Sequence, residues 1–149
     1  MKSMRVVKYS NRVFERVVPL LKKGTKEWGK EWRDEILRVY SRQDGEAYLA
    51  EDDGNVVGTI FLKKDVRVLV IYFLAVAEKE RMTGVGSSLV EFAEKIARRE
   101  RRILRVDVAK EFEKNVDFYA KLGFEKCGRV KNFYMDGDEQ IFLYKKPRR

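Results

Sequence analysis

The longest apolar stretch of the chain, Val68 to Ala77, is the feature that most restricts the folds open to it. The stretch is too short to cross a bilayer, and its Val, Ile, Tyr and Phe residues favour a strand over a helix. A strand that is apolar at nearly every position is expected where both of its faces are buried. The sequence therefore predicts a long buried strand over residues 66–76, around which the rest of a sheet is built.

A glycine-containing turn follows this strand and leads into an amphipathic helix. The turn is Arg81-Met82-Thr83-Gly84-Val85-Gly86-Ser87, and apolar residues then recur at helical spacing as far as Ile96. A helix N-terminus offers unpaired N–H groups and the positive end of the helix dipole, and both suit a phosphate. Glycines let the backbone approach such a ligand closely. The run has neither the Lys-Ser/Thr of a Walker loop nor the third glycine of the Rossmann pattern.

The other segments alternate between strand and helix patterns. Asp52-Asp53-Gly54-Asn55 predicts a hairpin turn, and Gly123 is placed to end a helix. Early strands joined by such turns are antiparallel, whereas the strand–helix–strand step over residues 66–108 predicts a parallel right-handed crossover. The sequence thus predicts an α/β fold with a mixed, mostly antiparallel twisted sheet of six to seven strands and helices on both faces. The further predicted strands are 5–9, 47–50, 56–62, 103–108, 124–134 and 140–144, and the further helices are 11–21, 25–40 and 113–122.

Composition excludes several kinds of chemistry. The chain has 149 residues, which suits a single domain over 1–149. It has no histidine, which removes serine–histidine triads and imidazole metal sites, and its one cysteine, Cys127, is expected to be buried. A reducing, cytoplasmic setting fits a lone cysteine, and no membrane segment is expected. The net charge of +9 indicates an anionic ligand, while a charged fraction of 38% is also typical of thermophile proteins.

Three motifs together resemble the GNAT (Gcn5-related N-acetyltransferase) superfamily. They are Leu74-Ala75-Val76, the Arg-x-x-Gly-x-Gly run of the turn, and Phe118-Tyr119-Ala120-Lys121-Leu122-Gly123-Phe124. The specific part covers residues 68–124, and the element order extends the resemblance over essentially the whole chain. The resemblance implies a central pair of strands that splay apart, with the pantetheine arm of acetyl-coenzyme A between them. No metal cofactor is expected, because the chain has no histidine and only one cysteine.

The resemblance also assigns the cofactor contacts. Backbone groups of Leu74 and Val76 would pair with pantetheine, and the N–H groups from Met82 to Ser87 would hold the pyrophosphate. The usual cofactor-contacting asparagine of the family is replaced here by Phe112, and Asn115 lies one helical turn later, where it can substitute. The full set of expected cofactor-binding residues is Leu74, Ala75, Val76, Arg81, Met82, Thr83, Gly84, Val85, Gly86, Ser87, Asn115, Tyr119 and Lys121.

Three residues are candidates for the chemistry. By the resemblance, the Val76 N–H polarises the thioester carbonyl and Tyr119 protonates the departing thiolate; the alternative for Tyr119 is a core aromatic. The central strand has no carboxylate to act as the base. Asp107, at the spacing from Tyr119 where N-terminal acetyltransferases often have a glutamate, is either the base, acting through water, or an ordinary structural aspartate.

The prediction is therefore an acetyl-coenzyme A-dependent N-acetyltransferase in which an amine attacks the thioester directly in a ternary complex. The acceptor is a small molecule or a peptide or protein amine, which the sequence does not identify. A catalytically weak module that binds acetyl-coenzyme A and regulates is the alternative. A nucleic-acid-binding domain has only the charge in its favour, so nucleic acid is not an expected partner. Either a monomer or a homodimer is expected.

Overall fold

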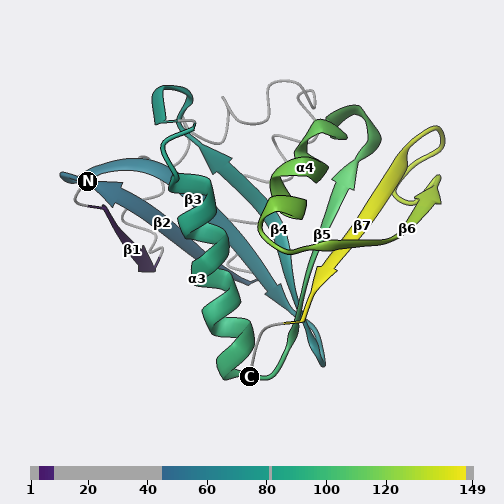
Figure 1. Cartoon of the computed structure of the whole chain (residues 1–149), viewed down its shortest axis with the longest axis horizontal. Coiled ribbons are helices and arrows are strands. Elements are labelled where there is room, and N and C mark those ends of the chain that lie inside the picture. The colour runs from purple at the N-terminus through teal and green to yellow at the C-terminus, as the bar shows by residue number, and fades with distance from the viewer. Residues whose placement is uncertain (1–3, 9–44, 81, 147–149) are drawn as a thin grey trace. The chain divides into compact units, whose positions relative to one another are not determined.

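The computed structural model describes residues 4–8, 45–80 and 82–146 (Figure 1). Its helices are α3 (Val85–Arg99) and α4 (Lys114–Lys121), with short 3-10 turns η3 (Glu78–Glu80) and η4 (Lys110–Phe112). The helices expected over residues 11–21 and 25–40 lie outside the described residues. The strands are β1 (Met4–Lys8), β2 (Glu46–Asp52), β3 (Asn55–Lys64), β4 (Val68–Val76), β5 (Ile103–Ala109), β6 (Glu125–Lys131) and β7 (Glu139–Lys145).

The strands form one mixed sheet in the order β1-β2-β3-β4-β5-β7-β6. Strand β2 pairs antiparallel with β1 and β3, and β7 pairs antiparallel with β5 and β6. Strand β4 pairs with β5 in parallel, as a crossover through α3 requires. The predicted mixed, mostly antiparallel α/β sheet is confirmed. Within it, contacts divide the chain into two compact units, and β4 and α3 each contribute residues to both.

The first unit comprises Met1–Lys63 and Phe73–Phe92. Its core includes the fully buried side chains of Leu49, Ile60 and Phe61. The β2–β3 hairpin closes as predicted: Asp52 pairs with Asn55, and Asp53 and Gly54 both have positive φ, at 51° and 78°. Two central residues with positive φ are the arrangement that matches the twist of a two-residue hairpin.

The second unit comprises Lys64–Tyr72 and Ala93–Arg149. Here the parallel register of β4 and β5 runs from Val68–Ile103 to Ile71–Val106, although β4 continues to Val76 and β5 to Ala109. Within this unit, these pairs all belong to the first half of β4.

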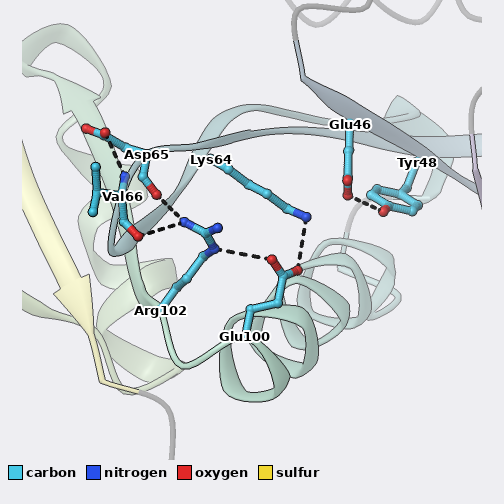
Figure 2. Close-up of polar contacts among 7 residues, drawn as sticks. All are labelled: Glu46, Tyr48, Lys64, Asp65, Val66, Glu100 and Arg102. Carbon is cyan, nitrogen blue, oxygen red and sulfur yellow. Dashed lines mark hydrogen bonds and ion pairs between the residues drawn. The ribbon is translucent and has the colours of Figure 1, made fainter.

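A polar network ties the turn before β4 to the residues that follow α3 (Figure 2). Glu100 pairs with Lys64 Nζ at 3.0 Å and with Arg102 Nε at 3.2 Å. The Arg102 guanidinium also donates to the carbonyl oxygens of Asp65 and Val66. The turn lies at Asp65–Arg67, because Lys63 and Lys64 extend β3 beyond the predicted strand of residues 56–62. Elsewhere in Figure 2, Tyr48 donates to Glu46 at 2.6 Å.

Two burial predictions differ from the structure. Burial alternates along β4, so that one face is buried and the other only half-buried. Cys127 is exposed rather than buried. The register of β6 against β7 shifts between Lys126 and Gly128, and a bulge of this kind leaves the intervening residue outside the ladder. Every residue of β6 is exposed, so the strand offers no buried position for a thiol.

Candidate functional site

The turn before α3 is defined by its hydrogen bonds and backbone angles. Both the hydroxyl and the N–H of Thr83 donate to the carbonyl of Glu80, which closes the turn. Met82 and Gly84 have positive φ, at 67° and 92°, and the Met82 side chain is fully exposed. The bond from Ser88 N to Gly84 O, at 3.0 Å, opens the helical ladder.

The first turn of α3 is therefore available to an anion. The N–H groups of Val85, Gly86 and Ser87 precede the ladder, and helix geometry gives them no intrahelical partner. The first turn of α3 contains no acidic side chain that would oppose the positive end of the helix dipole. A Cβ on Gly84 would meet no atom of the described residues within 4 Å, so these residues leave space beside the turn. We call residues 82–87 the cradle. Arg81 lies outside the described residues.

Gly58 on β3 is a residue that the sequence reasoning missed. A Cβ there would lie 2.8 Å from Val85 Cγ1 and 3.2 Å from the carbonyl oxygen of Ala75. Only a glycine lets the N-terminal end of α3 pack this closely onto the strand, and the position of the cradle depends on that contact. A glycine inside a strand pattern was the available signal, because it often marks a close approach.

The last residues of β4 present main-chain groups on the edge away from β3. The N–H of Ala77 donates to Val57 O on β3 at 2.8 Å. Successive residues of a strand direct their main-chain polar groups to opposite edges. Leu74 and Val76 therefore direct theirs away from β3, as the expected pantetheine contacts require. Ala75 lies between them with its side chain buried.

Tyr119 is fixed by the way α4 ends. Gly123 has a φ of 95°, its N–H donates to Ala120 O at 3.0 Å, and the N–H of Phe124 donates to Tyr119 O at 3.1 Å. These are the two bonds of a Schellman motif, whose usual hydrophobic contact is made here by the rings of Tyr119 and Phe124, 5.4 Å apart. The run from Phe118 to Phe124 is thus a helix-ending motif that also orients a tyrosine.

The environment of Tyr119 keeps its phenol protonated. The residue is 6% exposed, and burial raises the pKa of the phenol well above its usual range. The ring of Phe118 packs edge-on at 5.0 Å. Within the described part of the chain, the Tyr119 hydroxyl forms no hydrogen bond, so it is free to donate to a ligand.

The Asp107 carboxylate on β5 contacts two side chains, those of Arg105 and Tyr134. Its Oδ1 lies 3.2 Å from Arg105 Nε, but the two atoms are not aligned for a hydrogen bond, so the contact is an ion pair only. Its Oδ2 accepts from Arg105 Nη2 at 3.4 Å and from the Tyr134 hydroxyl at 3.3 Å. Burial raises the pKa of the Asp107 carboxyl, although the Arg105 charge and the two hydrogen bonds oppose this.

Asn115 and Lys121 lie on the exposed surface of α4, whereas Phe112 is half-buried in η4. Lys121 lines a hollow of about 630 Å³ formed within the second unit at the C-terminal ends of α3, α4 and β7. Lys145 in its wall is neutralised by Glu94 at 2.8 Å. Asn115 and Lys121 are thus both exposed and accessible to a ligand.

The structure distributes the predicted site residues between the two units. The first unit contains Leu74, Ala75, Val76 and the cradle, and the second contains Asp107, Asn115, Tyr119 and Lys121. Among the residues described, no group of three or more acidic or cysteine side chains is arranged to hold a metal. The described helices also include none of the length and apolar character that a membrane span requires.

Comparison with known proteins identifies sequence relatives. Residues 14–124 match the family described as the acetyltransferase (GNAT) family. A 5-NmdU N-acetyltransferase of Pseudomonas phage PaMx11 is 31% identical over 103 residues, which cover 68% of this chain and 69% of that protein. An N-acetyltransferase of Methanocaldococcus jannaschii is 31% identical over 115 residues, which cover 74% and 72%. These relatives bear the names of enzymes, which gives no support to a purely regulatory module.

Solved structures share the fold. A protein assigned to the GNAT family from Desulfovibrio desulfuricans superposes with a TM-score of 0.86 at 16% identity, covering 98% of this chain and all of that one (100%). A GNAT family acetyltransferase from Elizabethkingia anophelis, solved with acetyl-CoA bound, gives a TM-score of 0.77 at 21% identity, with 98% and 99% covered. At these identities the likeness concerns the fold.

Proposed function

Because the chain belongs to the acetyltransferase (GNAT) family and is an N-acetyltransferase that uses acetyl-coenzyme A, we propose that an amine attacks the thioester directly while both substrates are bound. The new C–N bond forms at the carbonyl carbon as the C–S bond breaks. The observation that carries the donor half of this proposal is the cradle, whose first-turn N–H groups have no intrahelical partner and suit a pyrophosphate.

The residues of the first unit hold and polarise the donor. Val85, Gly86 and Ser87 donate main-chain N–H groups to the pyrophosphate, which carries the negative charge that the helix dipole favours. Leu74 and Val76 offer the free edge of β4 to the pantetheine arm. The Val76 N–H donates to the thioester carbonyl oxygen and stabilises the charge that develops there, since a preorganised donor needs no rearrangement during the reaction.

Asp107 is the proposed base. An acceptor amine has a pKa of about 8 to 10.4, so most of it is protonated at neutral pH and must lose a proton before attack. Asp107 takes that proton through an ordered water, because the aspartate side chain is short. Its burial and its raised pKa make it a stronger base than an ordinary aspartate.

Tyr119 is the proposed acid. Its buried phenol stays protonated and its hydroxyl has no partner among the described residues, so it can donate to the departing sulfur. A thiol has a pKa of about 8.5, well below that of this phenol. Tyr119 therefore stabilises the leaving thiolate as a hydrogen-bond donor as the C–S bond breaks and keeps its own proton, and the thiolate takes its proton from water.

The proposal is tested by thiol release from acetyl-coenzyme A. The panel of acceptors holds a peptide N-terminal amine, a lysine side-chain amine, a polyamine, an aminoglycoside and 5-NmdU, the compound in the name of the phage relative. Direct attack predicts initial-rate lines that intersect when both substrates are varied. Parallel lines would instead indicate a covalent acetyl-enzyme and overturn the direct mechanism.

Tyr119→Phe tests the acid. We expect kcat to fall by about 100-fold, the lower range for acid–base catalysis, while the dissociation constant of acetyl-coenzyme A measured by calorimetry stays unchanged. Tyr144→Phe is the matched control, because the partner of the Tyr144 hydroxyl among the described residues is Glu125 on the surface. Equal kcat values for the two variants would remove Tyr119 from the mechanism.

A further inference from the structure

The turn between β6 and β7 is held by one carboxylate. Asp138 Oδ1 accepts the N–H of Phe133 at 2.7 Å, and Oδ2 accepts the N–H of Tyr134 at 3.1 Å and the Gln140 amide at 3.3 Å. Asn132, at a φ of 56°, accepts the N–H of Gly137 at 2.7 Å on the other side of the turn. The turn is therefore ordered from within by side-chain to main-chain bonds.

This ordering determines where Tyr134 points. The Tyr134 ring packs edge-on against Phe133 at 4.7 Å, and Phe133 packs against Phe142 of β7 at 5.1 Å. Phe142 is in turn the residue of β7 that pairs directly with Asp107 in the ladder. The chain of contacts starts at Asp138 and ends with the Tyr134 hydroxyl, 3.3 Å from Asp107 Oδ2.

We propose that Asp138 is a positioning residue that acts through Tyr134 on the Asp107 carboxylate. This proposal rests on the proposed function, in which Asp107 is the base. Asp138 fixes the backbone of Tyr134, and the Tyr134 hydroxyl then holds Asp107 ionised and in one orientation. Asp138 itself touches no reacting atom. Among residues 4–8, 45–80 and 82–146, the other side chain that contacts the Asp107 carboxylate is Arg105 on the same strand.

The electrostatic surroundings support this arrangement. Burial, together with the charge of Asp107, raises the pKa of Tyr134 to about 12, so the phenol stays a donor over the working range. The groups that face Asp107 are Arg105 on β5 and Tyr134 on the turn, and Tyr72 of β4 acts on Tyr134. A hydrogen bond to the ionised carboxylate favours that form, so its loss raises the pKa of Asp107.

The test measures the Asp107 carboxyl titration by carbon-detected NMR on the whole protein, together with the pH profile of kcat/KM. In Tyr134→Phe, the pKa of Asp107 and the acidic limb of the profile should both move to higher pH. Asp138→Ala should reproduce that shift, Asp138→Asn should give part of it because one acceptor remains, and the Tyr134→Phe/Asp138→Ala double variant should shift no further. Asp136→Ala, in the same turn, is the control and should leave both readouts at their wild-type values.

The outcomes separate this proposal from the proposed function. An unchanged Asp107 titration in Tyr134→Phe would overturn the positioning role, whatever the activity. If Asp138→Ala fails to fold, Asp138→Asn and Tyr134→Phe still decide the question. We call Asp107, Tyr134 and Asp138 the Asp107 array. If the Asp107 titration shifts as expected while the acidic limb of the profile stays fixed, the array is correct but the base is a group other than Asp107, and the proposed function is wrong in its choice of base.

Discussion

The cradle of the first unit and the Asp107 array of the second use different chemical groups. The cradle uses main-chain N–H groups that a helix start leaves unpaired, and its side chains serve mainly to shape the turn. The array uses the side chains of Asp107, Tyr134 and Asp138, which come from a strand and a turn far apart in sequence. A main-chain site depends on glycines and backbone angles, whereas a side-chain site depends on which residues the sheet brings together.

Gly58→Val should have the largest effect on acetyl-coenzyme A binding, because it displaces the end of α3 that forms the cradle. The new side chain would collide with Val85 and Leu89, and overpacking of this kind costs about 1–3 kcal/mol of unfolding free energy. Displacing one N–H from a charged phosphate costs about 1.5–3 kcal/mol, so the affinity for acetyl-coenzyme A should fall about tenfold or more by calorimetry.

Gly128→Val is the matched control for that change. Gly128 also lies inside a strand, but a Cβ there would meet nothing within 4 Å. We expect this variant to bind acetyl-coenzyme A as the wild type does and to melt within a few degrees of it. Equal binding by the two valine variants would show that the cradle does not depend on the packing of α3 against β3.

Gly84→Ala should have an intermediate effect. A φ of 92° is unfavourable for a residue with a Cβ, and strain in the left-handed region costs about 1–2 kcal/mol. Gly54→Ala, at a φ of 78° in the β2–β3 turn, carries the same kind of strain with the same open space. Thermal melting should therefore show similar losses for both, while only Gly84→Ala should weaken acetyl-coenzyme A binding. Unaltered affinity in Gly84→Ala would argue against the cradle as the pyrophosphate site.

Ser87→Ala should have the smallest effect, which sharpens the contrast with the array. The half-buried hydroxyl adds at most one hydrogen bond to a site whose donors are main-chain groups. We expect a loss of about 0.5 kcal/mol, roughly a twofold change in the dissociation constant. A loss as large as that of Gly84→Ala would mean that the cradle binds through side chains after all.

The same contrast explains what could be predicted from the sequence. The strand β4, the start of α3 after the glycine-containing turn, the hairpin at Asp53–Gly54 and the end of α4 at Gly123 are local patterns, and each element lies close to its predicted bounds. The partners of Asp107 depend on the register of β5 with β7, which leaves no local signal, and on contacts of the turn at residues 132–138, whose Asp-Gly-Asp pattern indicates a turn but not its partners. Gly58 is between these cases, because its neighbours are distant in sequence although a glycine inside a strand is itself visible.

The Arg102 network has a consequence for folding kinetics. Arg102 donates hydrogen bonds to the carbonyl oxygens of Asp65 and Val66, which lie 37 and 36 positions earlier in the chain. At the start of the parallel pair, the Ile103 N–H donates to Arg67 O at 2.8 Å. The register of β4 and β5 is thus set at a contact that forms only after the crossover has closed. Loop closure of this kind delays parallel strand pairing. In a pulse-labelling experiment, the Ile103 amide should gain protection from exchange later than the amides of the β2–β3 hairpin.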